Sequence, residues 1–77
     1  MEELPNMNPG LEVQKKILAD KMDNAKAERY STILSAQAAQ EIGNEKEVKR
    51  LQDAVASMTK AFIFYQKKLK ELETPGE

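Results

Sequence analysis

The sequence predicts an all-α protein built as a two-helix antiparallel coiled-coil hairpin. Three observations support this prediction. Two long stretches without Pro or Gly consist mostly of strong helix formers. Gly43 and Asn44 separate these stretches, and they combine a residue that ends helices with one that starts them. The second stretch also repeats its apolar residues at heptad spacing.

The first helix is expected over residues 9–42. Asn8 is a suitable N-cap, and Pro9 suits the first helical position because no partner is needed there for an N–H. Gly10 weakens the first turn, which allows the helix to begin a residue or two later. Residues 1–8 are expected to form a flexible N-terminal arm.

The second helix is expected over residues 45–73, after a turn at residues 43–44. Gly43 can adopt the left-handed conformation that ends a helix, and Asn44 can cap the next one. Glu47 follows Asn44 at the spacing of a capping box. Residues 74–77 contain Pro75 and are expected to form a C-terminal tail.

Apolar residues of the second helix form an uninterrupted seam. Its members follow alternating steps of three and four residues: Val48, Leu51, Val55, Met58, Phe62, Tyr65, Leu69 and Leu72. The stripe on the first helix is less regular and comprises Leu11, Leu18, Met22, Ala25, Ile33 and Ala36, with interruptions at Lys15, Arg29 and Gln40. Folding about the turn places Phe62 opposite Ala25, and such pairing of large with small residues suits interdigitated packing.

A second apolar surface flanks this seam. Tyr30 and Leu34 lie to one side of the stripe on the first helix, and Ala56 and Ile63 lie on the same side of the hairpin. A surface of this kind with few charges usually marks an interface. The simplest way to cover it is self-association into a four-helix bundle or a higher oligomer, and burial by a different protein is the alternative.

Arg29 and Phe64 are further candidate interface residues. Arg29 falls in the stripe, about level with Met58. Its stem can pack while its guanidinium reaches water, or it can set the register by pairing with a carboxylate of another copy. Phe64 points away from both the seam and Ile63. It belongs either to a dimer interface or to a hot spot for a helix or extended peptide of another protein.

Lysines gather at the open end of the predicted hairpin. Lys15 and Lys16 lie near the start of the first helix, and Lys67 and Lys68 lie near the end of the second. Together with Tyr65 they are candidate residues for binding an anionic small molecule such as a nucleotide. Acidic residues at the same end favour the other interpretation, a solvated surface with ion pairs along each helix.

Composition narrows the range of functions. The chain has 77 residues and contains neither Cys nor His, which removes the ligands of structural zinc and the commonest general base. We therefore expect no metal, no cofactor and no enzymatic activity. The net charge of −1 argues against general nucleic-acid binding. Without a signal-peptide pattern or a membrane-spanning apolar run, a soluble cytoplasmic protein is expected.

The expected function is thus protein binding. We expect a homo-oligomeric helical hairpin that binds, sequesters, chaperones or inhibits a partner protein through its apolar flank. Two alternatives remain open. One is an oligomer that holds an anionic metabolite, and the other is a structural element of a larger assembly.

Overall fold

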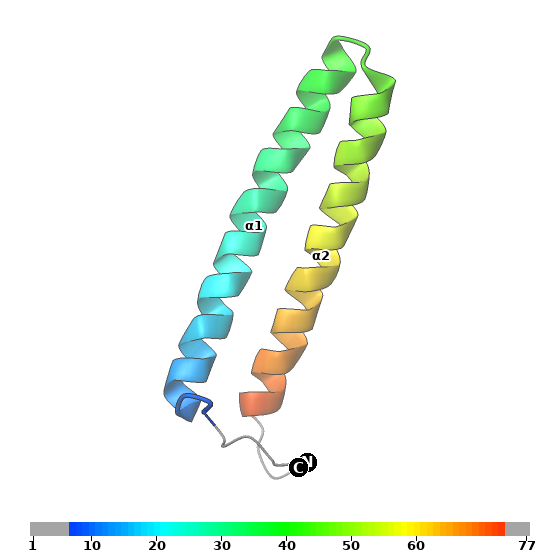
Figure 1. Cartoon of the computed structure of the whole chain (residues 1–77). Coiled ribbons are helices and arrows are strands. Elements are labelled where there is room, and N and C mark those ends of the chain that lie inside the picture. Colours follow the sequence, from blue (N-terminus) through cyan, green and yellow to red (C-terminus); the bar gives the residue numbers. More distant parts are fainter. Residues whose placement is uncertain (1–6, 74–77) are drawn as a thin grey trace.

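The computed structural model of the chain describes residues 7–73 and consists of two helices (Figure 1). Helix α1 spans Leu11–Glu41 and helix α2 spans Glu45–Glu73. They pack against each other as an antiparallel hairpin, and no strand occurs within residues 7–73. The predicted arm and tail fall mainly at residues 1–6 and 74–77, outside the described part. The all-α hairpin predicted from the sequence is confirmed.

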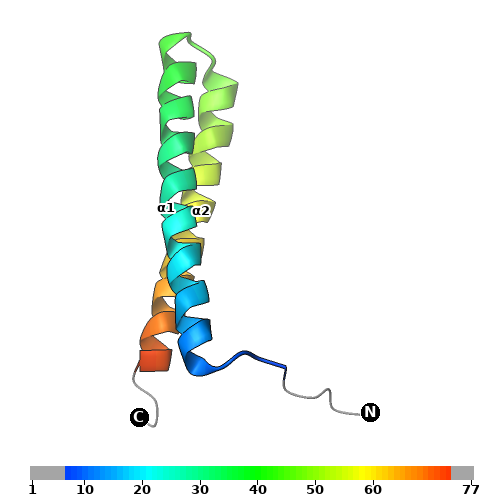
Figure 2. The same cartoon turned by 90° about the vertical axis from the view of Figure 1, so that its left-hand side faces the viewer.

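A side view shows that the hairpin is a single layer of helices. In Figure 2, α1 lies in front of α2, and both broad faces of the pair are left open. Each helix is about 45 Å long at 1.5 Å per residue. Neither described helix contains an apolar stretch long enough to cross a membrane.

The turn between the helices is stabilised by backbone hydrogen bonds. The N–H of Asn44 donates to the carbonyl of Ala39 at 2.9 Å, and the N–H of Gly43 donates to the carbonyl of Gln40 at 3.1 Å. These two bonds form a Schellman motif, which satisfies carbonyls at the end of α1. The motif needs a left-handed residue, and Gly43 supplies it with φ of 76°.

The start of α2 has a side-chain cap, but the predicted capping box is only half formed. The Oδ1 atom of Asn44 accepts a hydrogen bond from the N–H of Glu47 at 3.2 Å, as an N-cap should. The carboxylate of Glu47 does not return to Asn44. It accepts from Arg50 instead, with an Nε–Oε1 distance of 2.9 Å. The physical reason is that the N–H of Asn44 already donates to Ala39 in the Schellman motif.

The start of α1 lacks such a side-chain cap. Gly10 is the N-cap residue, with extended backbone and no side-chain hydrogen bond, so α1 begins at Leu11, two residues after Pro9. The Nε2 atom of Gln14 donates to the carbonyl of Pro9 at 2.6 Å and ties the first turn to the preceding chain. The later start agrees with the high entropic cost of holding glycine in a helix.

The seam predicted on α2 forms the contact with α1, because all eight of its residues are half-buried. The α1 stripe differs in part from the prediction. Leu11 and Gln40 are exposed, whereas Thr32 is half-buried and Ala39 is the one buried residue within residues 7–73. The hydroxyl of Thr32 lies 3.7 Å from the sulfur of Met58. If polar residues are counted as members of the α1 stripe, the stripe follows a regular heptad repeat.

Candidate protein-interaction surface

One broad side of the hairpin combines exposed apolar residues with neutral polar residues. We call it the Tyr30 face and define it by side chains on one side of the seam: Tyr30, Ile33, Leu34, Gln37, Gln52, Ala56, Thr59 and Ile63. Its largest apolar members are well exposed, with Tyr30 at 64%, Ile63 at 55% and Leu34 at 46%. Four of the six candidate interface residues therefore belong to this face.

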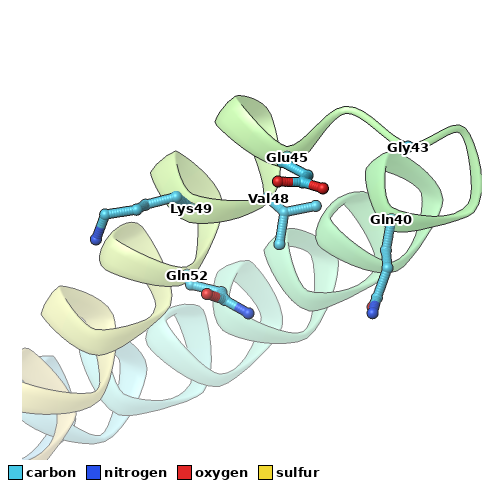
Figure 3. Close-up of a pocket in the computed structure, with 6 residues that line it drawn as sticks. All are labelled: Gln40, Gly43, Glu45, Val48, Lys49 and Gln52. Carbon is cyan, nitrogen blue, oxygen red and sulfur yellow. The ribbon is translucent and has the colours of Figure 1, made fainter.

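Shallow grooves run between the helices along the Tyr30 face. The groove nearest the turn has a volume of about 380 Å³. Figure 3 shows Gln40 of α1 and Val48 and Gln52 of α2 among the residues that line it. The next groove, of about 260 Å³, continues over Ile33 and Gln37. Glu45 and Lys49 also line the groove nearest the turn, whereas the polar residues of the second groove are all glutamines. Glutamine can both donate and accept hydrogen bonds, which suits contact with another polypeptide.

Arg29 links the two helices across the Tyr30 face. Its Nε donates to the hydroxyl of Thr59 at 2.8 Å, and that hydroxyl donates to the carbonyl of Val55 at 2.9 Å. Thr59 is next to Met58, the residue expected to lie level with Arg29. Neither Glu28 nor any other carboxylate within residues 7–73 forms an ion pair with this guanidinium.

Lys26 stands beside Arg29 and covers an aromatic ring. Its Nζ lies 5.6 Å from the centre of the Phe62 ring, within the range of a cation–π contact. Ala25, Lys26, Arg29, Thr59 and Phe62 together line an open groove of about 260 Å³. The middle of the Tyr30 face is therefore apolar at its base and positively charged at its rim.

Phe64 lies on the opposite flank of α2 from Ile63, as predicted from the helical spacing. Its side chain is 56% exposed. Its ring meets the edge of the half-buried Tyr65 ring, with 5.9 Å between the ring centres and 68° between the planes. This contact fixes Phe64 against the hairpin and leaves much of its ring open to a partner.

The lysines proposed for anion binding are divided between different local contacts. Lys16 pairs with Asp20 and Lys68 pairs with Glu71, each at 3.7 Å along its own helix. Lys15 is half-buried, and Lys67 is exposed. The groove beside Tyr65 is lined by Lys21 and Glu28, not by any of these four lysines. This arrangement favours the interpretation of a solvated surface with intrahelical ion pairs.

Charge at the other end of the hairpin is organised by one ion pair. The guanidinium of Arg50 donates two hydrogen bonds to the carboxylate of Glu47. These bonds lower the pKa of Glu47 below its ordinary value and raise the pKa of Arg50. Across residues 7–73, acidic side chains form no cluster that could hold a metal ion.

Several exposed features of α1 were not found from the sequence. Val13 is 50% exposed and Ile17 is 43% exposed. The link between Arg29 and Thr59 and the stacking of Lys26 on Phe62 were also not predicted. Both contacts could have been predicted from the register of the hairpin, because it brings the segment around residue 27 level with the segment around residue 61.

Comparison with known proteins adds no functional information. The chain matches no protein-family model, and neither a curated protein nor a solved structure is significantly similar to it. Only the geometry of the hairpin itself therefore bears on its function.

Proposed function

We propose that the protein is a non-enzymatic interaction module that self-associates through the Tyr30 face and holds a partner protein as an assembly. One observation carries the proposal. Within residues 7–73 a single small side chain, that of Ala39, is buried, while nine large apolar side chains are exposed. Three of the nine, Tyr30, Leu34 and Ile63, lie on the Tyr30 face. Exposed apolar residues grouped in this way within a polar rim are typical of protein interfaces.

A second hairpin laid on the Tyr30 face would supply the core that one hairpin lacks. The seam residues of α2 are half-buried, so much of their apolar area stays in water in the isolated chain. Covering the grooves beside the seam would remove that area from water, at about 25 cal/mol for each Å². Four-helix bundles close their cores in this way.

Phe64 gives the assembly a place for a different protein. It lies on the flank opposite the Tyr30 face and stays exposed when that face is covered. An exposed aromatic ring held by a neighbouring ring is a suitable anchor for a partner, because little side-chain entropy is lost when it binds. Binding, sequestering, chaperoning and inhibition would all use this kind of contact.

The proposal is tested by placing a charge on the Tyr30 face. Ile63→Glu should weaken self-association by at least about a hundredfold, because a buried carboxylate must be desolvated without a partner. Ile63→Ala should weaken it less. Ser57→Glu, on the other flank of α2, is the matched control and should leave association unchanged. Sedimentation equilibrium across a hundredfold dilution measures all four chains.

Two results would refute self-association through this face. One is a parent chain that stays monomeric and fully helical at every concentration. The other is equal weakening by Ile63→Glu and Ser57→Glu. In the expected case, the helical content of the parent should also rise with concentration, because association stabilises the folded chain by mass action.

A further inference from the structure

The broad side that bears the Tyr30 face also carries charges, near the middle of α1, for which the hairpin supplies no partner. Lys26 and Arg29 contact Phe62 and Thr59, and neither forms an ion pair within the described residues. Asp23 lies two helical turns before Tyr30 and so on the same side of α1. It is exposed, and it too takes part in no ion pair within the described part. On this side of α1, residues 23–29 thus present one acidic and two basic side chains. Glu28, the other acidic residue of the segment, lines the groove beside Tyr65 instead.

From this arrangement we infer that a second copy occupies the Tyr30 face with α1 packed antiparallel on α1 of the partner. The inference rests on the self-association proposed above and specifies its geometry. A two-fold axis would cross the face near the level of Ile63. Asp23 of each copy would then lie opposite Lys26 of the other, with Arg29 about one turn away.

The midpoint of α1 supports this position of the axis. Helix α1 spans Leu11–Glu41, so its middle residue is Lys26, within two residues of the expected axis. An axis at that level overlaps the two copies of α1 almost fully, as a closed symmetric dimer requires. The whole broad side that contains the Tyr30 face is about 45 Å long and 20 Å wide and offers roughly 900 Å² per copy, and a stable interface needs about 800 Å² per partner.

Side-chain sizes also agree with the antiparallel arrangement. Tyr30 of one copy would lie near the small side chain of Ala19 in the other copy, and the two Ile63 side chains would meet at the axis. At these two positions a large residue would face a small one on α1, and two apolar residues would face each other on α2. Both Ala19 and Ile63 are exposed in the single hairpin.

The other symmetric packing would place α1 on α2 of the partner at the same level. The segment 23–29 would then face Thr59, Ile63 and Gln66, and none of these can neutralise Asp23, Lys26 or Arg29. Charges brought into an interface without partners oppose association. Charge complementarity therefore favours the packing of α1 on α1.

A charge-exchange experiment tests this geometry. Asp23→Lys makes the charges that residues 23–29 present on this side wholly basic, and Lys26→Glu combined with Arg29→Glu makes them wholly acidic. Each variant alone should dissociate about tenfold more readily than the parent, because like charges meet twice across the two-fold axis. An equimolar mixture of the two variants should restore parent-like affinity. In native mass spectrometry of this mixture, heterodimers should exceed the half of all dimers that random pairing gives.

The outcomes separate this inference from the proposed function. Asp53→Lys makes the same chemical change on the outer side of α2 and should leave both affinity and mixing unchanged. A mixture that behaves as the sum of its two weakened components overturns the packing of α1 on α1. If Ile63→Glu still abolishes association in that case, self-association through the Tyr30 face stands with a different arrangement of helices. Variants that retain parent affinity when measured alone also overturn the inference.

Discussion

The two helices differ in how they distribute their apolar residues. Helix α2 concentrates them in the seam, and only Ile63 and Phe64 among its large apolar side chains are well exposed. Helix α1 interrupts its seam with polar residues, and it exposes Leu11 at the end of its stripe and four large apolar side chains on other sides: Val13, Ile17, Tyr30 and Leu34. A helix with one apolar stripe has one neighbour, whereas a helix with apolar residues on several sides is suited to more than one. Helix α1 is therefore the one expected to contact another molecule.

The prediction with the largest expected effect compares the loss of unfolding free energy at a seam residue with the loss at a residue of the Tyr30 face. Leu51→Ala removes a half-buried seam residue of α2 and should cost about 2 kcal/mol of unfolding free energy. Leu34→Ala makes the same change on the Tyr30 face, at a residue that is 46% exposed, and should cost less than about 1 kcal/mol. Urea melts of the dissociated chains measure both. Equal losses would contradict the assignment of seam and flank.

The sequence was most informative where one type of force dominates. The α2 seam could be predicted in full because its heptad positions are all large apolar residues whose burial decides the packing. The turn was predicted from Gly43 and Asn44, since a positive φ and an N-cap each favour few residue types.

The α1 stripe was predicted less well because polar side chains take part in it. Thr32 is half-buried and reaches Met58, and Arg29 bridges to Thr59. A pattern based on apolar residues omits Thr32 and treats Arg29 as an interruption. The Glu47 half of the capping box was wrong for a related reason: the N–H it would need was already bonded within the turn. Competition between partners is a property of the fold and is not visible in residue spacing.

A smaller effect would sharpen the comparison by making α1 resemble α2. Lys15 occupies a half-buried heptad position of α1, level with the end of the α2 seam. Lys15→Leu should stabilise the hairpin by about 1 kcal/mol, because it adds apolar contact without changing helix propensity. Lys16→Leu, at an exposed neighbouring position, is the matched control and should not stabilise the hairpin. Thermal melts that show equal effects would place Lys15 outside the seam.

The beginnings of the two helices differ as well, and this difference gives the smallest effect. Helix α1 starts at Gly10 without a side-chain cap. Helix α2 starts at Asn44, whose side chain caps it, and its first turns also contain the Glu47–Arg50 ion pair. A negative charge near the start of a helix complements the helix dipole. The start of α2 should therefore respond to pH more strongly than the start of α1.

The effect of pH on the start of α2 can be measured separately at Glu47. The hydrogen bonds from Arg50 lower its pKa in the folded chain. A carboxyl group with a lowered pKa stabilises the fold above its unfolded-state pKa, and this contribution disappears as the pH falls through the folded-state value. The melting temperature of the parent should therefore exceed that of Glu47→Gln near neutral pH, and the difference should vanish in strong acid. Glu28→Gln removes a carboxylate that forms no ion pair within the described residues, so its difference from the parent should change less with pH. A Glu47→Gln difference that grows on acidification would show that the Arg50 contact does not stabilise the start of α2.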